Sequence, residues 1–295
     1  MRTIIIDSQI LTAFMECSEK YDLMFIQNLK SMEVVDPLVK GDVLHTGLEA
    51  YYRHLKKVLN ENVVPERKII HEAGVEISVV EMRAKAALNG INLDLAEEVI
   101  KTTLEYFEFY KDDDLIPLEI EEPFIKEIYA NEEEDLRILY AGKIDLIATS
   151  ARYQWKPTPF DNKSTTRNST PSSRSNQFFG YTDALDSNLL VINRIGFQKS
   201  LSAAERFKRL PVSYPPEYRE KWRRETVVKW GRKFAWALDN QEFEENISSC
   251  DKFSGCTFKK ICESITPEAR EWVIQSQYVT GDSWDITRSM GKKNA

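Results

Sequence analysis

The hydrophobic residues of roughly the first 115 positions recur mostly with the spacing of amphipathic helices. One stripe, with steps of three or four residues, is formed by Leu44, Leu48, Tyr51 and Leu55. Residues 65–88 and 93–110 carry further stripes with the same period. Because a period of about 3.6 residues places side chains on one side of a helix, the pattern predicts a mainly helical section over residues 1–115.

After residue 115 the pattern changes to segments rich in Ile, Leu and Val, bounded by turn-forming or polar residues. Such segments are typical of strands and occupy residues 116–130, 136–150 and 188–197. Helical spacing returns at residues 176–186 and 216–240, and a Ser/Thr/Asn/Pro-rich loop is expected over 164–175. This alternation predicts an α/β (α+β) fold with a mixed central sheet flanked by helices.

The sequence contains no internal repeat, and we expect one interlocked unit over residues 1–295. Its expected parts are a helical section (1–115), a sheet core (116–215), a C-terminal helix with a cysteine-rich segment (216–265) and a tail (266–295).

Composition and charge narrow the classes of protein. The chain has 42% hydrophobic and 29% charged residues, which is ordinary for a soluble globular protein. No apolar run approaches the about 18 residues of a membrane span, and the N-terminal run is too short for a secretory signal. We therefore expect no membrane partner and a cytoplasmic location.

The net charge of -7 argues against a general polyanion-binding surface. Acidic residues concentrate in 105–136 and basic residues in 193–233, so a nucleic-acid groove in the second half stays open beside the alternative of a solvated helix face. Residues 222–236 interleave three tryptophans with basic residues. These tryptophans would either stack on unpaired bases or face the core.

Two acidic residues in the sheet core are candidates for chemistry. Asp145 lies among apolar residues after Ala141-Gly142, which we expect to break the strand, and a lone carboxylate there would tend to protonate unless paired or metal-bound. Asp161 follows after a connection of hairpin size, so the two carboxylates could lie side by side and share a divalent cation. Lys163 would point to the same side of an extended strand as Asp161. The alternative is a polar turn at Asp161-Asn162-Lys163.

Three further polar residues are unremarkable one by one. His45 lies on a predicted helix beside the apolar stripe, where a histidine is either a core residue with satisfied hydrogen bonds or a ligand. Gln177 and Tyr181 lie one helical turn apart and could reach a phosphate or a base.

Taken in order, these elements resemble the PD-(D/E)XK nuclease superfamily and, within it, the RecB-type branch. The matching elements are Gly41…His45, Gly142…Asp145, Asp161-Asn162-Lys163 and Gln177…Tyr181, over roughly residues 8–265. The glutamate-containing strand that commonly comes before them is matched through Glu121 or Glu122. The resemblance implies a restriction-endonuclease-like fold.

The resemblance also implies roles. His45, Asp145, Asp161 and the backbone carbonyl of Asn162 would bind one or two Mg²⁺ or Mn²⁺ ions, and Lys163 would be the catalytic lysine. Gln177 and Tyr181 would position the DNA strand, and two loop residues, Arg167 and Arg174, would contact phosphates. The strand that carries Asp161 departs from the family in having Pro157 and Pro159 ahead of it, so we expect a short strand that begins near Thr158.

The four cysteines, Cys17, Cys250, Cys256 and Cys262, suggest a metal centre. Scattered core thiols are the alternative, and a disulfide framework is not expected in the cytosol. The usual close cysteine pairs of zinc sites are missing. The arrangement resembles the iron–sulfur staple of AddB-type and CRISPR-associated adaptation nucleases, although the C-terminal spacing differs from theirs. That resemblance implies a [4Fe–4S] cluster, with Zn²⁺ as the alternative, closing the C-terminus onto the N-terminus.

We therefore expect a metal-dependent deoxyribonuclease that acts on single-stranded or frayed DNA ends in a bacterial, archaeal or phage-infected cell. Recombination, repair, phage DNA metabolism and CRISPR spacer acquisition are the expected settings, with a helicase or integrase as a possible partner. The sequence has no ATP-binding P-loop of its own. The alternatives are a non-catalytic DNA-binding or scaffold protein with the same fold, and a zinc-stapled interaction protein.

Overall fold

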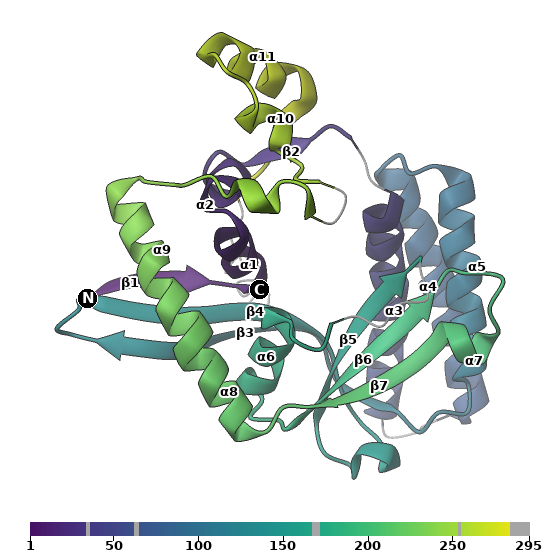
Figure 1. The fold of residues 1–295 in the computed structure, drawn as a ribbon. Helices are drawn as coiled ribbons and strands as arrows, with labels where there is room; N and C mark the ends of the chain where they lie inside the picture. Colours follow the sequence, from purple (N-terminus) through teal and green to yellow (C-terminus); the bar gives the residue numbers. More distant parts are fainter. Residues whose placement is uncertain (34–35, 62–64, 167–171, 253–254, 284–295) are drawn as a thin grey trace.

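The protein is described by a computed structural model that covers residues 1–33, 36–61, 65–166, 172–252 and 255–283 (Figure 1). At its centre lies a six-stranded mixed sheet with helices on both sides. The predicted α/β fold class and the restriction-endonuclease-like arrangement of sheet and helices are confirmed. The two longest strands are β3 (Ile116–Asn131) and β4 (Leu136–Thr149), which form an antiparallel hairpin.

Strand β4 pairs with β3 along one edge, and along its other edge it pairs with two different strands, one after the other. β1 (Arg2–Ile6) runs parallel to residues 136–140, and β5 (Thr158–Thr165) runs antiparallel to residues 146–148. Residues 141–145 lie between these two partners, so the sheet opens at that point. Beyond β5, the parallel strand β6 (Leu189–Gly196) and the antiparallel strand β7 (Phe207–Ser213) complete the sheet.

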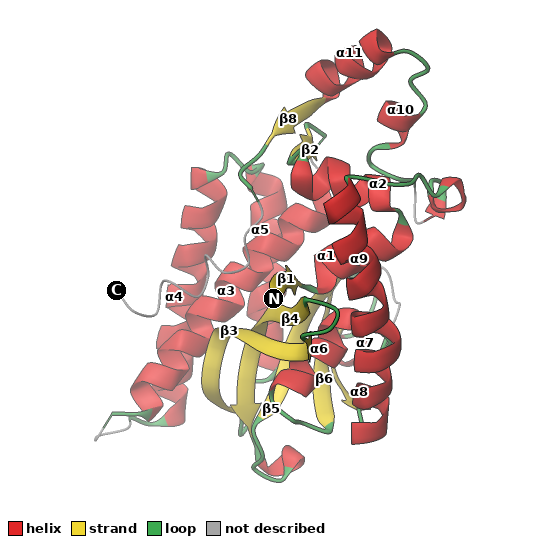
Figure 2. Cartoon of the chain, turned by 90° about the vertical axis from the view of Figure 1, so that its left-hand side faces the viewer, coloured by secondary structure: helices red, strands yellow, loops and turns green. Residues whose placement is uncertain are grey.

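One side of the sheet is covered by three long helices, α3 (Asp36–Leu59), α4 (Arg67–Leu88) and α5 (Leu93–Phe109) (Figure 2). Their predicted apolar stripes bury Leu44, Leu48 and Tyr106 against β5 and β6. Gly47 brings α3 close to α4, because a Cβ atom there would lie 2.6 Å from the sulfur of Met82. This helical layer fixes α3 above the opening of the sheet.

The other side is covered by α1 (Ser8–Glu16), α6 (Asn176–Ala184) and a long rod. The rod consists of α8 (Pro216–Trp222), the π-helical turns Arg223–Val228 and α9 (Lys229–Asn240), and it matches the helix predicted over 216–240. Short helical turns lie at Ala151–Tyr153, between β4 and β5, and at α7 (Ala203–Arg206). Among the helices of the described ranges, none combines the length and apolar character that crossing a membrane requires.

Segments from both ends of the chain pack together above the sheet (Figure 1). The N-terminal part contributes α2 (Ser18–Tyr21), the π-helical turn Asp22–Ile26 and β2 (Leu29–Ser31). The C-terminal part contributes the turn Ile247–Ser249, α10 (Lys259–Cys262), α11 (Pro267–Gln277) and β8 (Tyr278–Thr280), which pairs with β2. The C-terminal segment therefore closes onto the N-terminal one, as expected.

Several local predictions differ from the structure. Gly142 does not break its strand, since β4 continues through it; the missing side chain instead makes room for the ring of Phe124, which would lie 2.8 Å from a Cβ atom. The helical section contains β1 and β2, and the segment that we expected to be a tail contains α11 and β8. The short strand predicted from Thr158 is the observed β5.

Candidate active site

His45 reaches the opening of the sheet from α3. Its side chain is half-buried, and its Nε2 atom lies 3.0 Å from the backbone carbonyl oxygen of Asn162. Its Nδ1 atom lies 3.7 Å from a carboxylate oxygen of Asp145. The histidine therefore joins the α3 layer to two of the groups that we predicted as metal ligands with it.

The two predicted aspartates lie on neighbouring strands and are both buried. Asp145 lies in β4 between the residues that pair with β1 and those that pair with β5. Its carboxylate accepts a hydrogen bond of 2.7 Å from the backbone N–H of Asn162. Asp161 is 0% exposed. The side chain of Asn162 points to the opposite side, where its oxygen accepts a 2.7 Å hydrogen bond from Asn193. The part of β5 that carries Asp161 and Asn162 is thus fixed from both sides.

Burial strongly affects the protonation of both aspartates. It is the largest cause that raises the pKa of Asp145 to about 7, followed by the neighbouring carboxylate of Glu121. Burial likewise raises the pKa of Asp161 to about 7, against the opposing effect of the Lys163 ammonium. A bound cation would favour the ionised carboxylates and reverse these shifts.

Lys163 lies on the same side of β5 as Asp161, as predicted, and its ammonium is held between two acceptors. Its Nζ atom is 2.9 Å from an Asp161 carboxylate oxygen and donates a 2.9 Å hydrogen bond to the amide oxygen of Gln177. The amide nitrogen of Gln177 donates to the hydroxyl of Tyr181 at 2.8 Å, and that hydroxyl donates to the carbonyl oxygen of Lys143. Gln177 and Tyr181 therefore support the lysine in this structure, a role that the sequence did not suggest.

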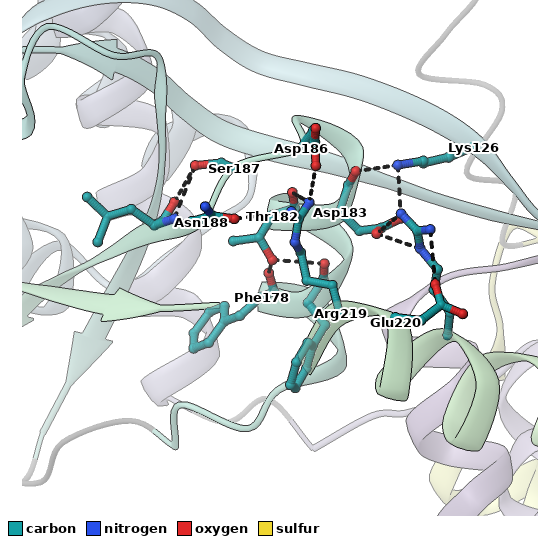
Figure 3. A network of polar contacts seen from close by, with 12 residues as sticks. Lys126, Phe178, Thr182, Asp183, Asp186, Ser187, Asn188, Arg219 and Glu220 are labelled. Carbon is teal, nitrogen blue, oxygen red and sulfur yellow. Dashed lines mark hydrogen bonds and ion pairs between the residues drawn. The ribbon is translucent and has the colours of Figure 1, made fainter. Parts of the chain in front are cut away.

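The helix that carries Gln177 and Tyr181 is held by a buried polar network (Figure 3). The Asp183 carboxylate, 1% exposed, forms ion pairs with Lys126 of β3 and with Arg223 of the rod. Arg219 donates to the carbonyl oxygen of Thr182 and pairs with Asp186 just beyond the end of α6. These contacts fix α6 between the sheet and the rod.

Gly180 sets the distance between α6 and the sheet. A Cβ atom at this position would lie 2.3 Å from a ring carbon of Tyr140 on β4. The absence of a side chain therefore lets α6 come close enough for Gln177 to reach Lys163.

Glu121 of β3 is an additional candidate ligand that our predicted ligand set did not contain. Ligand atoms of His45, Glu121 and Asp145 all lie within 4.8 Å of one another, whereas Asp161 turns its carboxylate toward Lys163 and is not in this group. Glu121 adopts a left-handed backbone conformation, with a φ of 52°, and its carboxylate pairs with Lys143. Such a conformation in a strand carries strain and is typical of functional sites. The sequence offered the adjacent Glu121 and Glu122 without distinguishing them.

A pocket of about 470 Å³ opens over these groups and is lined by His45, Glu121 and Asp145. Asp7, which directly follows β1, and the first turn of α1 also line the pocket. Imidazole nitrogen, carboxylate oxygen and carbonyl oxygen are ligands that Mg²⁺ and Mn²⁺ accept, and imidazole suits Mn²⁺ better than Mg²⁺. The donor set therefore fits a divalent cation.

The predicted DNA-binding arginines are not placed at the pocket by any described contact. Arg174 is exposed, and Arg167 lies outside the described residues. Of the rod's tryptophans, Trp222 is buried at 4% exposure and donates to the side-chain oxygen of Asn176, while Trp236 is 55% exposed. Of the two predicted roles, stacking on bases or packing in the core, Trp222 therefore has the second.

The four cysteines lie in the region where the two chain ends pack together. The backbone N–H of Asn246 lies 3.3 Å from the sulfur of Cys17, and the Asn246 carbonyl lies 3.9 Å from the sulfur of Cys250. Cys256 and Cys262 pack against one small apolar cluster. Within the described ranges no three cysteine sulfurs form a group within 4.8 Å; the Cys262 sulfur instead lies with the carboxylates of Glu19 and Glu245. Burial raises the pKa of the Cys262 thiol to about 12.

Comparison with known proteins identifies the family. Residues 9–263 match the family model described as the PD-(D/E)XK nuclease superfamily. A solved structure entitled "Crystal structure of SSO0001" is similar at 13% identity and a TM-score of 0.33, covering 72% of this chain and 94% of that chain, a likeness too weak to support an argument. The search of curated proteins gives no match. Since the family model spans most of the sequence, the chain belongs to the PD-(D/E)XK nuclease superfamily, whose members are metal-dependent nucleases.

Proposed function

We propose that this protein is a metal-dependent deoxyribonuclease that degrades single-stranded or frayed DNA from its ends. The observation that carries the proposal is the meeting of His45, Asp145, the Asn162 carbonyl and the Asp161–Lys163 pair at one opening of the sheet. These groups come from β4, β5 and α3, and α3 is distant in sequence from the two strands. A site that had lost its function would be expected to lack at least one of them, which disfavours a non-catalytic scaffold.

The residues that would hold one or two Mg²⁺ or Mn²⁺ ions are His45, Asp145, Asp161 and the carbonyl of Asn162. Glu121 would join them, because its carboxylate lies in one group with His45 and Asp145. When bound, such an ion supplies positive charge at the scissile phosphate and lowers the pKa of water. The His45 imidazole and the Asn162 carbonyl already lie 3.0 Å apart, so both would be available to hold such an ion.

Lys163 acts on the water or on the phosphate. Its ammonium has three hydrogen atoms, and the two fixed acceptors, Asp161 and Gln177, use two of them. The third can be donated to the attacking water, which it orients, or to a phosphate oxygen, whose developing charge it offsets. Because both acceptors are held by the protein, the ammonium is oriented before the substrate arrives.

The test compares Mn²⁺-dependent degradation of end-labelled single strands, linear duplexes and closed circles. Lys163→Ala should abolish degradation while circular dichroism shows an intact fold, and the matched control Lys199→Ala, at an exposed position, should retain it. We expect single strands to be degraded fastest and circles to survive. Equal activity of Lys163→Ala and the control would end the nuclease proposal, whereas efficient cleavage of circles would replace end-dependent action by endonuclease action.

We further propose that the protein belongs to the RecB-type branch and carries a [4Fe–4S] cluster held by Cys17, Cys250, Cys256 and Cys262. The contacts of Cys17 and Cys250 with Asn246 support the proposal, as does the packing of the C-terminal segment against α2. The cluster would tie the two chain ends together. Anaerobically purified protein should then be brown and contain iron and acid-labile sulfide; colourless protein with one equivalent of zinc would favour Zn²⁺ instead.

DNA is the partner that the proposal requires, and cytoplasm is the proposed location. A helicase or integrase partner would fit a role in recombination, repair, phage DNA metabolism or CRISPR spacer acquisition. End-dependent degradation suits these settings because each of them generates free or displaced strands.

A further inference from the structure

The outer surface of α4 carries an apolar stripe that the fold leaves exposed. Four large side chains of the stripe remain accessible: Ile69 at 55%, Ile77 at 39%, Val80 at 63% and Leu88 at 85%. The stripe is completed by Ala73 and Ala84, so that apolar residues recur at steps of three or four along the whole helix. Figure 2 places α4 at the outer edge of the helical layer.

This stripe is separate from the side of α4 that packs into the core. The buried side chains of the helix, including Ser78 and Met82, face the neighbouring helix α3. Single exposed apolar residues are common on proteins, but a continuous stripe from Ile69 to Leu88, over about five turns and about 29 Å, is typical of a helix that binds a partner.

The stripe is symmetric about its own midpoint, between Ser78 and Val79. Ile69 and Leu88 are equally distant from this point, as are the two alanines and the central pair Ile77 and Val80. If a second α4 lies antiparallel across the first, each of these pairs meets at the same level: large with large, small with small. A twofold axis at the midpoint then uses the same contacts twice, as an isologous dimer interface requires.

The charges along one border of the stripe fit the same arrangement. Glu72, Glu76 and Arg83 lie on one side of α4, because they are separated by four and seven residues. In the antiparallel pair, Arg83 of the second copy comes level with residue 74, between Glu72 and Glu76 of the first. Within one chain Arg83 pairs with Glu97 at 3.1 Å, and their side chains are 62% and 56% exposed. Such an exposed pair contributes little, so Arg83 can turn to the second copy.

We propose that the protein forms a twofold symmetric dimer through antiparallel packing of α4 against α4 of a second copy. A second copy is the favoured occupant because both the size pattern and the charge pattern complement themselves, which a different partner would not require. A single helix pair is a small interface, so dissociation in the micromolar range is expected. The proposal does not depend on the nuclease activity.

The test is sedimentation velocity of the full chain over about a hundredfold range of concentration. Wild-type protein should shift from monomer to dimer, and Val80→Glu should raise the dissociation constant more than tenfold, because the twofold axis brings two carboxylates into the apolar centre. Ile265→Glu, at a 97% exposed position outside α4, is the matched control and should dimerise normally. A wild-type protein that stays monomeric, or a dimer that Val80→Glu leaves unchanged, overturns the proposal.

The antiparallel register has its own test. Ala73→Cys and Ala84→Cys proteins, when mixed, should be joined by a short thiol cross-linker more than either protein alone, with wild type as the baseline for the native cysteines. Arg83→Glu should weaken the dimer, and adding Glu72→Arg and Glu76→Arg should restore it. Equal cross-linking in mixed and unmixed samples, or no rescue by the reversed charges, contradicts the antiparallel arrangement.

Discussion

Replacing Asp161 by asparagine should change how the stability of the metal-free protein depends on pH. The Asp161 carboxyl is completely buried, and burial raises its pKa from 3.8 to about 7 although Lys163 opposes the shift. An asparagine at this position would keep the shape of the side chain but could not ionise. The substitution therefore isolates the free-energy cost of the buried charge.

The sign follows from the protons bound in each state. The unfolded chain releases the Asp161 proton near pH 3.8, whereas the folded chain keeps it until about pH 7, so the free energy of unfolding falls as pH rises between these values and then levels off. This pKa difference corresponds to about 4 kcal/mol. The difference in free energy of unfolding between Asp161→Asn and wild type should therefore increase, in favour of the variant, by about this amount as the pH rises from 4 to 8.

The assay is urea unfolding, followed by tryptophan fluorescence, in the presence of a chelator at several pH values. Asp282→Asn removes an exposed carboxylate and serves as the control, whose pH dependence should match that of wild type. Adding Mn²⁺ above pH 7 should stabilise wild type and have much less effect on Asp161→Asn. If the curves of Asp161→Asn and wild type run parallel from pH 4 to pH 8, the reasoning from the buried charge is refuted.

Three further predictions concern other parts of the molecule. Gln177→Leu should lower kcat in the DNA degradation assay and leave KM nearly unchanged, because it removes one of the two acceptors that orient Lys163. An unchanged kcat would contradict that role. Gly47→Ala should destabilise the protein by about 1–3 kcal/mol in urea unfolding, since its Cβ would overlap the side chain of Met82. Cys17→Ser should lower the iron content per chain and the midpoint of thermal unfolding; full iron content would remove this residue from the proposed cluster.

The fold could be predicted where local patterns determine structure. The hydrophobic segments at 116–130 and 136–150 correspond closely to β3 and β4, and the prolines before Asp161 gave the start of β5. Helical spacing likewise located α3 to α5. In these segments each residue's burial follows from its neighbours along the chain.

The predictions failed where a distant contact decides the structure. The run Thr3–Ile6 forms β1 because it pairs with β4, more than 130 residues away, and nothing in its own length distinguishes it from other short apolar runs. Gly142 suggested a strand break because its function, to accept the ring of Phe124 from β3, depends on cross-strand register. Strand β7 was not predicted, because its basic residues are not typical of a buried strand. One of them, Arg209, is buried against Tyr110 and pairs with Asp113.

The candidate site shows the same division between what is local and what is not. The order of the motifs could suggest that His45, Asp145 and Asp161 meet, because it carries the resemblance to a family. It could not suggest that the pairing partner of β4 changes from β1 to β5 across residues 141–145. This change creates the opening in the sheet that the side chain of His45 reaches from α3. Nor could it suggest that Gln177 accepts a hydrogen bond from Lys163, since that contact depends on how closely Gly180 lets α6 approach the sheet. The chemical groups are thus encoded locally, while their alignment depends on strand pairing and helix packing, so substitutions at Gly180 should impair activity as substitutions at the site itself would.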